Sequence, residues 1–430
     1  MCYILQSKIA LVVLYQKKNI YSFNALIGAI ETERGLDDVK IYFIRGYENL
    51  INELEKIFQN HQKVVVGISF FTTQLWEILD LIKILRKKYN QRALFIAGGP
   101  HPTGDPEGTL EMGFDLVVKG EGEETLIEIL KKIKNDESVD DISGIAYLDA
   151  DNNVILTEKR QWINLDKYPP LPVKNVKFGA IEITRGCPYV CYFCQTPYIL
   201  GNLPRHRSIN SICETVKFMK SFNKTDIRFI SPNAFSYGSL DGKTLNLPQL
   251  ENLLRQIREI IKPKGRIFLG SFPSEVRPEH VTNETLGLVL KYAANDNITI
   301  GAQSGSQRIL DLCNRGHSVK SVYKAVELTI ENGLLANVDF IFSLPNETEE
   351  DIDLTIKLMK ELSGMGANIH THTFMPLPLT VFANEKVKKV EDKIRMVISE
   401  LTSKGLADGN WKKQEILAKK ISKYLKAKMD

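Results

Sequence analysis

The feature that most constrains the fold is an alternation of short, continuous apolar runs with stretches of amphipathic spacing. Five apolar runs in the first part of the chain are predicted to be strands: residues 9–15, 39–45, 64–70, 93–99 and 115–120. Apolar residues recur every three or four positions in three stretches predicted to be helices: residues 47–59, 75–89 and 123–134. Continuous apolar strands between amphipathic helices indicate a parallel sheet covered on both faces. This part of the chain is therefore predicted to be a doubly wound, Rossmann-like α/β domain.

A second series of the same kind follows. Its six predicted strands are residues 178–184, 226–232, 265–272, 297–305, 337–345 and 367–378. Helical stretches separate them, for example residues 209–222 and 319–333. Six consecutive strand–helix units favour an open, partial (β/α)6 barrel over a closed eightfold barrel.

Turn residues set the predicted boundaries between these parts. The segment DADNN (149–153) predicts a hairpin, and LDKYPPLPVKN (165–175) predicts a proline-rich linker. The lysines near the end of the chain are interpreted as the solvated face of helices rather than a binding patch. The predicted parts are a first domain, a hairpin with linker, a barrel and a helical extension: residues 1–140, 141–176, 177–385 and 386–430.

Composition excludes several classes of protein. The 430 residues are 43% hydrophobic and 25% charged, as in globular proteins, which argues against extended disorder. The net charge of +4 is mild: by itself it neither demands nor excludes a nucleic-acid partner, and no such partner is expected. The apolar run at residues 9–15 is too short to span a bilayer, so no membrane association is expected. Six cysteines are too few for a disulfide framework, which favours a cytoplasmic protein.

Three loops fall where a doubly wound sheet binds its ligands, beyond the carboxyl ends of the strands. They are residues 69–74, 98–108 and 120–125. Their glycines let the backbone approach a ligand closely and adopt positive φ. No G-x-G-x-x-G opens the first helix, so an ordinary dinucleotide site is not expected. A large flat ligand across this edge is one interpretation, and glycines that only build tight turns are the other.

Half of the six cysteines fall within one short segment, ITRGCPYVCYFCQTP, as Cys187, Cys191 and Cys194. Structural zinc usually takes two close pairs of ligands, and the nearest candidates for a fourth ligand, His206 and Cys213, stand in no such pair. A [4Fe–4S] cluster held by three cysteines keeps one iron open for a molecule that carries an amine and a carboxylate. Structural zinc and free thiols remain the alternatives from spacing alone.

The segment CPYVCYFC resembles the radical SAM motif C-x-x-x-C-x-aromatic-C in its spacing and in the aromatic residue before the last cysteine. The resemblance implies that the three cysteines ligate a [4Fe–4S] cluster. It also implies that Phe193 lies against the adenine of S-adenosylmethionine (SAM). Tyr189 and Tyr192 are interpreted as screens that keep water away from the cluster.

Further segments of the barrel resemble the signature stretches of the radical SAM subgroup with an Elp3-type core: residues 274–282, 301–318, 339–351 and 374–378. The resemblance implies that SAM lies across the strand ends, where polar side chains and backbone hold it. The matching side chains are Ser274, Glu275, Arg277, Gln303, Ser304 and Arg308. Arg277 and Arg308 suit a carboxylate, which a guanidinium binds with two hydrogen bonds, and an ordinary surface ion pair is the alternative for each. His317 matches the subgroup without an assigned role. Three isolated cysteines are interpreted as packing thiols: Cys2, Cys213 and Cys313.

A doubly wound domain ahead of such a barrel, with GGPHPT and GEGEETL at its ligand edge, resembles the B12-binding radical SAM proteins. The corrinoid motif D-x-H-x-x-G, whose histidine ligates cobalt, is absent from residues 1–140. The resemblance therefore implies a cobalamin held without that histidine, or a domain that has lost the corrinoid. His101 is the candidate substitute ligand, and a histidine that fixes the turn is the alternative. The implied cobalamin contacts are Ser69, Thr72, Gly98, Gly99, His101, Gly120, Glu121 and Gly122.

These resemblances imply a radical SAM C-methyltransferase. The 5′-deoxyadenosyl radical removes hydrogen from an unactivated carbon, and methylcobalamin supplies the methyl group. Architecture and length resemble an archaeal family that includes the glutamine C-methyltransferase of methyl-coenzyme M reductase. That family implies the Cα of a glutamine in the reductase as the methyl acceptor and an electron donor such as ferredoxin.

Three other functions remain as alternatives. The first is a B12-binding radical SAM enzyme that methylates or rearranges a small molecule or lipid. The second is RNA methylthiolation, which the lack of a second cysteine cluster disfavours. The third is a non-catalytic corrinoid or redox sensor.

Overall fold

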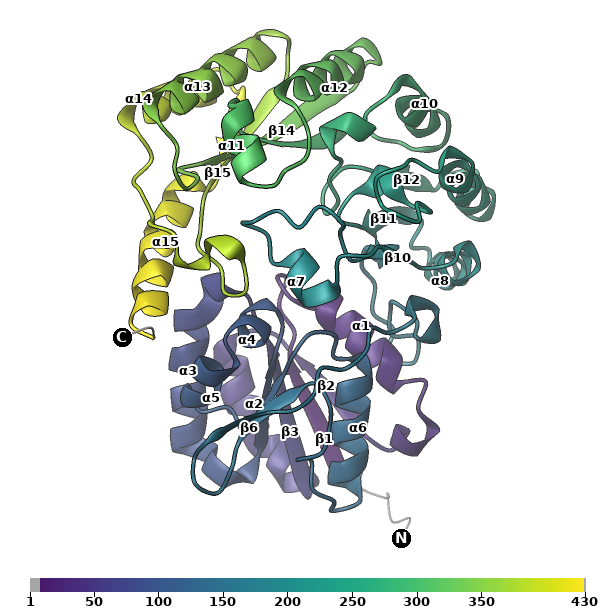
Figure 1. Ribbon diagram of the computed structural model, residues 1–430. Coiled ribbons are helices and arrows are strands. Elements are labelled where there is room, and N and C mark those ends of the chain that lie inside the picture. The colour runs from purple at the N-terminus through teal and green to yellow at the C-terminus, as the bar shows by residue number, and fades with distance from the viewer. Residues whose placement is uncertain (1–7, 429–430) are drawn as a thin grey trace. The chain divides into compact units, whose positions relative to one another are not determined.

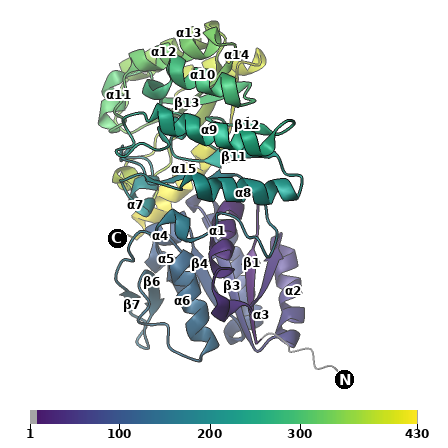
Figure 2. The same cartoon turned by 90° about the vertical axis from the view of Figure 1, so that its right-hand side faces the viewer.

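The computed structural model describes residues 8–428 and divides the chain into two compact units, Met1–Gly179 and Ala180–Asp430 (Figures 1 and 2). The predicted packing role of Cys2 lies outside the described residues. None of the described helices combines the length and the apolar character needed to cross a membrane.

The first unit is built on a seven-stranded sheet in the order β2-β1-β3-β4-β5-β6-β7. Neighbouring strands are parallel from β2 to β5, and the antiparallel hairpin β6–β7 extends the sheet beyond β5. All six residues of β1 are buried, as expected of a strand covered on both faces. The strands are β1 (Ile9–Leu14), β2 (Lys40–Ile44), β3 (Lys63–Ser69), β4 (Leu94–Gly98), β5 (Leu116–Val118), β6 (Ile145–Leu148) and β7 (Val154–Leu156).

Helices cover both faces of this sheet, which confirms the predicted doubly wound fold (Figures 1 and 2). Helices α1 and α6 pack against each other on one face, and α2 contacts β1 and β3. The chain places β2 on one side of β1 and all later strands, beginning with β3, on the other side. Such a topological switch point opens a ligand crevice at the carboxyl edge of the sheet. The helices are α1 (Ile20–Ile30), α2 (Tyr47–Asn60), α3 (Leu75–Tyr89), α4 (Pro100–Gly104), α5 (Pro106–Glu111) and α6 (Glu123–Lys134).

Two segments of this unit differ from the sequence-based expectation. The predicted loop 98–108 is largely helical, because Pro100 and Pro106 each open a short helix, where the missing N–H of proline costs nothing. The predicted hairpin forms around residues 149–153, but it belongs to the first sheet instead of standing apart from it.

The second unit is an open, partial barrel, as predicted. One sheet has the order β12-β11-β8 and another has the order β13-β14-β15-β16, and an isolated parallel bridge pairs Ile300 of β13 with Val276 in the segment after β12. A separate antiparallel pair, β9 with β10, flanks the cysteine segment. The strands are β8 (Ile181–Glu182), β9 (Thr184–Arg185), β10 (Arg205–His206), β11 (Asp226–Ile230), β12 (Arg266–Phe268), β13 (Asn297–Gln303), β14 (Leu335–Phe342), β15 (Asn368–Thr373) and β16 (Ala407–Gly409).

Helices follow the barrel strands in regular succession (Figure 1). The C-terminal region is helical as predicted, with one addition: the short strand β16 between its two helices pairs with β15 and so extends the barrel sheet. The helices are α7 (Thr196–Leu200), α8 (Ile209–Ser221), α9 (Leu247–Ile261), α10 (Asn283–Tyr292), α11 (Gln307–Leu312), α12 (Val319–Glu331), α13 (Glu349–Gly364), α14 (Asp392–Ser403) and α15 (Trp411–Lys426).

A glycine inside α1 provides a test of packing in the first unit. A Cβ atom at Gly28 would lie 2.5 Å from the carbonyl oxygen of Pro169, whereas one at Gly287 in α10 would meet nothing within 4 Å. We expect Gly28→Ala to lower the free energy of unfolding by about 1–3 kcal/mol through overpacking. The control Gly287→Ala should raise it by about 0.5–1 kcal/mol through helix propensity. Urea denaturation followed by circular dichroism measures both, and equal effects would contradict the packing argument.

Candidate functional site

The cysteine segment leaves β9 through a turn that only glycine can make. Gly186 has φ +90°, and a Cβ there would lie 2.2 Å from the carbonyl oxygen of Leu203. Directly after the turn, the amide of Cys187 donates to the carbonyl of Gly201 at 3.0 Å. The β9–β10 pair therefore fixes the start of the segment beside the carboxyl end of β8.

The segment after α11 fixes the other side of the cysteine loop. The amide of Tyr192 donates to the carbonyl of Cys313 at 3.0 Å. The Asn314 side chain donates to the carbonyl of Tyr189 at 2.9 Å and to that of Val190 at 3.2 Å. The left-handed backbone of Val190, with φ +50°, is thus held in place by neighbours far away in the sequence.

The three thiols are suited to a metal cluster. Burial raises the pKa of Cys187, and it raises the pKa of Cys194 to about 11, so the thiolates need a positive centre to form. The three cysteine sulfurs do not all lie within 4.8 Å of one another. Among the described His, Cys, Asp and Glu side chains, only one group of three meets that distance, and it contains no cysteine. At least one pair of the cysteine sulfurs therefore lies more than 4.8 Å apart, whereas the ligands of one tetrahedral ion are about 3.8 Å apart at a Zn–S bond of about 2.3 Å. A cuboidal cluster fits this spacing better than zinc does.

Arg315 connects the cysteine loop to the sheet. Its Nη1 donates to the Sγ of Cys191 at 3.6 Å, and its Nη2 donates to the carbonyl of Gly301 at 2.8 Å. Burial lowers the pKa of the guanidinium, but the Cys191 thiolate and the Glu275 carboxylate outweigh burial and raise it. Arg315 is thus a fixed positive charge beside the predicted cluster ligands. The motifs in the sequence did not identify it as a site residue.

Buried polar atoms without a hydrogen-bond partner gather around Arg315 within the described residues. Arg277 donates to the carbonyl of Arg315 at 2.5 Å, and His317 lies 3.2 Å from the carbonyl of Ala302 on β13. Buried atoms of this kind are uncommon in folded proteins unless a ligand or water satisfies them. The atoms are Arg277 Nη1, Glu279 Oε2, Gln303 Oε1, Arg315 Nε and His317 Nδ1. Two free N–H donors and two free oxygen acceptors suit the carboxylate and the amino group of SAM.

Two of the predicted SAM residues, Arg277 and Gln303, belong to this group, and a third, Glu275, interacts electrostatically with Arg315. Arg277 is buried, and its guanidinium lies over the ring of Tyr189, 3.3 Å from the centroid. Gln303 ends β13 with φ +74°, a strained backbone that turns its side chain beside Gly301. Burial raises the pKa of Glu275, which also feels the charges of Arg315 and Asp339.

The structure gives three other predicted SAM residues local partners. The Ser274 hydroxyl donates to the carbonyl of Phe229 at 2.7 Å. The Ser304 hydroxyl lies 3.3 Å from that of Thr355. Arg308 is half-exposed and forms an ion pair with Asp351, which is the alternative considered for that residue. These contacts support the barrel and do not by themselves point to a cofactor.

Phe193 packs against the small core that follows α11, with Ile309, Cys313 and Leu344 among its members. Cys213 is buried in α8, so both of the described isolated cysteines are buried, and neither lies in the cysteine loop.

The predicted cobalamin residues of the first unit line one edge of its sheet. Ser69, Gly98 and Gly120 lie at or just beyond the carboxyl ends of β3, β4 and β5, which are neighbours. Gly99 has φ +97°, and a Cβ there would lie 2.7 Å from the Ser69 hydroxyl, so only glycine lets the two strands approach. Glu121 accepts a hydrogen bond from the amide of Ile163 at 2.9 Å, which gives its carboxylate a structural partner. Gly122 immediately precedes α6 as its N-cap.

His101 is completely buried in α4. Its Nδ1 lies 3.2 Å from the Thr72 hydroxyl, and its Nε2 lies 3.9 Å from an oxygen of Asp105. Its ring also lies beside Phe70, with centroids 5.4 Å apart. This geometry favours the interpretation that His101 fixes the turn after β4.

Two family models match the two units. Residues 24–130 match the B12 binding domain, and residues 181–359 match the Radical SAM superfamily. The chain thus combines a B12-binding domain with a radical SAM domain, which defines a radical SAM enzyme. Two of the predicted cofactors, SAM and cobalamin (vitamin B12), are those for which these two families are named.

Two curated relatives share most of this architecture. An "Uncharacterized methyltransferase PH0819" of Pyrococcus horikoshii is 27% identical over 340 residues, which are 76% of this chain and 70% of the relative. A "Putative methylthiotransferase MJ0865" of Methanocaldococcus jannaschii is 27% identical over 350 residues, which are 78% of this chain and 71% of the relative.

Solved structures confirm the fold. The radical SAM methyltransferase TsrM of Kitasatospora setae, with cobalamin and a [4Fe–4S] cluster bound, matches with a TM-score of 0.68 at 17% identity, over 88% of this chain and 77% of TsrM. The cobalamin-dependent radical SAM enzyme OxsB matches with a TM-score of 0.63 at 20% identity, over 82% of this chain and 51% of OxsB. The chain therefore has the fold of cobalamin-dependent radical SAM enzymes.

Glu347, in the loop before α13, provides a pH test of the barrel. Burial raises its pKa to about 8, and the neighbouring Asp351 carboxylate adds to the rise. The folded protein therefore holds this proton more tightly than the unfolded chain, and the free energy of unfolding falls as pH rises from the ordinary value of 4.5 toward 8. The glutamine introduced in Glu347→Gln cannot titrate, so only the unsubstituted protein loses stability over this range. The free energy of unfolding of Glu347→Gln minus that of the unsubstituted protein should therefore rise by about 3–5 kcal/mol between pH 4.5 and pH 8. Urea denaturation at several pH values measures the difference, and a pH-independent difference would contradict the assignment.

The geometry of His101 predicts its behaviour toward cobalt. We expect His101→Asn to leave the axial coordination of bound cob(II)alamin unchanged, because the His101 ring is completely buried beside Phe70 and its Nδ1 is engaged by Thr72. Electron paramagnetic resonance should show no nitrogen splitting from a histidine in either protein, with His61→Asn as the control. A splitting that disappears only in His101→Asn would identify His101 as a cobalt ligand.

Proposed function

We propose that this protein is a cobalamin-dependent radical SAM methyltransferase that methylates an unactivated sp3 carbon. The observation that carries the proposal is the group of unpartnered buried polar atoms beside the three-cysteine loop, in a chain that also matches the B12 binding domain. Together, the two domains suit methyl transfer to a carbon that no side-chain base can deprotonate. When bound, the cluster and SAM supply a carbon-centred radical, and cobalamin supplies the methyl carrier.

The residues of the second unit hold and orient SAM in this proposal. Nη1 of Arg277 is free to donate to the SAM carboxylate, while its Nε is occupied by Glu279 at 2.5 Å. The free oxygens of Glu279 and Gln303 are acceptors for the amino group. Burial, with the charges of Arg315 and Arg277, lowers the pKa of His317 to about 2, so His317 stays neutral beside these cations.

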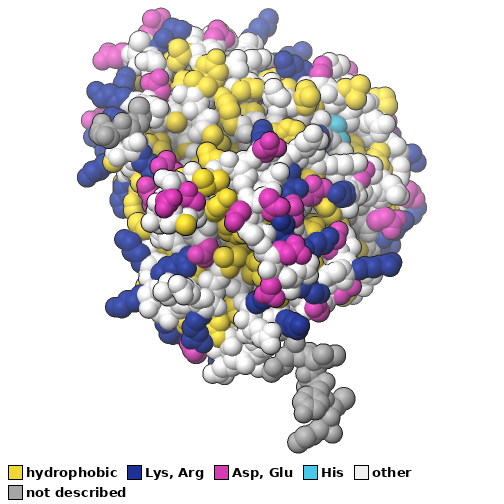
Figure 3. All heavy atoms as spheres, turned by 60° about the horizontal axis from the view of Figure 1, so that its bottom comes forward, with side chains coloured by type: hydrophobic (Ala, Val, Ile, Leu, Met, Phe, Trp, Pro, Cys, Tyr) yellow, Lys and Arg dark blue, Asp and Glu magenta, His cyan; other side chains and the backbone are white. Residues whose placement is uncertain are grey.

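We further propose the Cα of a glutamine in methyl-coenzyme M reductase as the methyl acceptor, with a donor such as ferredoxin supplying electrons in the cytoplasm. This substrate rests on the resemblance in architecture and length to the archaeal family described above. Archaeal relatives that span about three quarters of the chain are consistent with it. On the face displayed in Figure 3, acidic and basic side chains are interspersed, which suits a protein or small-molecule substrate better than a polyanion.

Co-expression with the reductase α subunit, in medium containing methyl-deuterated methionine, tests this proposal. We expect one deuterated methyl group on a single glutamine of the reductase, located by tandem mass spectrometry. An unmodified reductase, with enzyme that retains cluster and cobalamin, would eliminate this substrate. Labelled methyl in a small molecule or lipid would favour the alternative acceptor.

A second candidate is methylthiolation, because one relative is named a putative methylthiotransferase. Such enzymes need an additional sulfur source, and the sequence has no second group of clustered cysteines to hold one. A product that gains sulfur together with the methyl group would identify this chemistry.

The cluster ligands provide a direct test of the enzyme class. We expect Cys191→Ala to reduce the formation of 5′-deoxyadenosine from SAM under strong reductant by at least about 100-fold, because the cluster loses one of three ligands and the partner of Arg315. Cys213→Ala is the matched control, since that buried thiol lies 3.7 Å from Gln256 in a different part of the barrel. Liquid chromatography of the products measures both rates, and similar losses in the two variants would argue against the assigned ligand set.

A further inference from the structure

Three side chains of the barrel form a compact group that the site described above does not use. Asp339 lies on β14, and His370 and His372 lie on the neighbouring strand β15. Asp339 and His370 are direct partners in the parallel register, and His372 follows two positions later on the same face of its strand. Their candidate ligand atoms all lie within 4.8 Å of one another, which no other group of three such residues in the described chain achieves.

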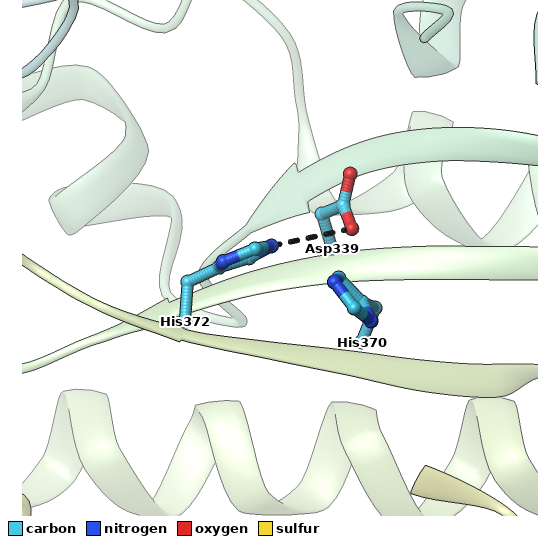
Figure 4. A group of neighbouring side chains, drawn as sticks. All are labelled: Asp339, His370 and His372. Carbon is cyan, nitrogen blue, oxygen red and sulfur yellow. Dashed lines mark ion pairs between the residues drawn. The ribbon is translucent and has the colours of Figure 1, made fainter. Parts of the chain in front are cut away.

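The three side chains converge on one point (Figure 4). Nε2 of His372 lies 3.6 Å from Oδ1 of Asp339, and the centroids of the two imidazole rings are 4.7 Å apart. The exposed fractions of the side chains are 13% for Asp339, 32% for His372 and 37% for His370. The group is therefore only partly shielded from bulk water and is open to a ligand.

Each histidine is oriented by a second partner. Nδ1 of His370 is within hydrogen-bond distance of the carboxylate of Asp408, the residue opposite it on β16. A carboxylate on one ring nitrogen is the usual support for a histidine that binds metal through the other. Nδ1 of His372 lies 3.1 Å from the side-chain nitrogen of Gln414 at the start of α15.

We propose that Asp339, His370 and His372 bind a single divalent transition-metal ion, such as Zn²⁺ or Fe²⁺. Two imidazole nitrogens and one carboxylate oxygen suit these ions better than Mg²⁺ or Ca²⁺, which prefer oxygen alone. Three protein ligands leave at least one coordination position open. The ion is distinct from the iron–sulfur cluster, because none of its ligands is a cysteine.

The proposed ion lies on strands that adjoin the predicted SAM site. Gly301 on β13 is the register partner of Asp339, and a Cβ at Gly301 would lie 2.5 Å from Nη2 of Arg315 and 3.6 Å from Oε2 of Glu275. Asp339 is therefore one strand away from the network that contacts Cys191. The open position of the ion suits an oxygen or nitrogen atom of a substrate bound in the barrel.

Gln414 sets the tautomer of His372 and thereby tunes the site. Its Oε1 accepts from the amide of Thr373 at 2.8 Å, so its Nε2 donates to Nδ1 of His372. Without metal, His372 therefore carries its proton on Nε2, the atom that faces Asp339. Metal binding replaces this proton and releases it to solvent. In Gln414→Glu, one carboxylate oxygen can still accept from the amide of Thr373. The other can accept a hydrogen bond from a proton on Nδ1 of His372, which leaves Nε2 of His372 free for the ion.

Zinc binding to the full chain tests the proposal after the cluster has been reconstituted, so that the cysteines are occupied. We expect one Zn²⁺ per chain in equilibrium dialysis with elemental analysis. His370→Ala and His372→Ala should weaken binding at least about 100-fold, and Asp408→Asn about 10–100-fold. Gln414→Glu should tighten it about tenfold or more, a gain that misfolding cannot produce.

His61→Ala is the matched control, because His61 lies in the first unit and contacts Tyr42. It should leave zinc binding unchanged. Cobalt(II) substitution should give visible d–d bands without the sulfur-to-cobalt bands of a cysteine site. A zinc content that does not differ between the unsubstituted protein and His370→Ala would overturn the proposal, as would sulfur-to-cobalt bands. Unchanged affinity in Gln414→Glu would overturn the tautomer argument.

Discussion

The buried guanidinium of Arg315 is the interaction on which the second unit depends. It donates both to the sulfur of Cys191 and to the carbonyl of Gly301, so one rigid cation joins the cysteine loop to β13. A guanidinium suits this position because it stays charged when buried and directs several donors in one plane. The unpartnered atoms of Arg277, Gln303 and His317 lie around this cation, and they remain available to a bound ligand or to water.

Both units use the carboxyl ends of parallel strands. In the first unit, the loops after β3, β4 and β5 meet along one edge because those strands are neighbours. In the second unit, the cysteine loop follows the first barrel strands, and Gln303 ends β13. Loops at these ends can vary without disturbing the sheet. The sheets therefore provide the scaffold, while a few glycines and buried charged side chains such as Arg315 set the geometry of the loops.

Much of the fold could be predicted, because apolar runs and amphipathic spacing report burial directly. The segment after β4 was predicted as a loop, since glycine and proline usually signal turns, but Pro100 and Pro106 open helices there. The cysteines were predictable from spacing, whereas Ser274, Ser304 and Arg308 have local partners that sequence cannot reveal. Arg315 was missed because its role comes from contacts with residues far away in sequence.

The sequence by itself determined the two series of strands and helices and the three-cysteine loop, because these features depend on neighbours within a few residues. Only the tertiary structure decided which polar groups remain unpartnered around Arg315. It also decided that Asp339 on one strand meets His370 and His372 on the next. The physical reason is register: pairing of distant strands brings these side chains to one face, and no local pattern in the chain specifies that pairing.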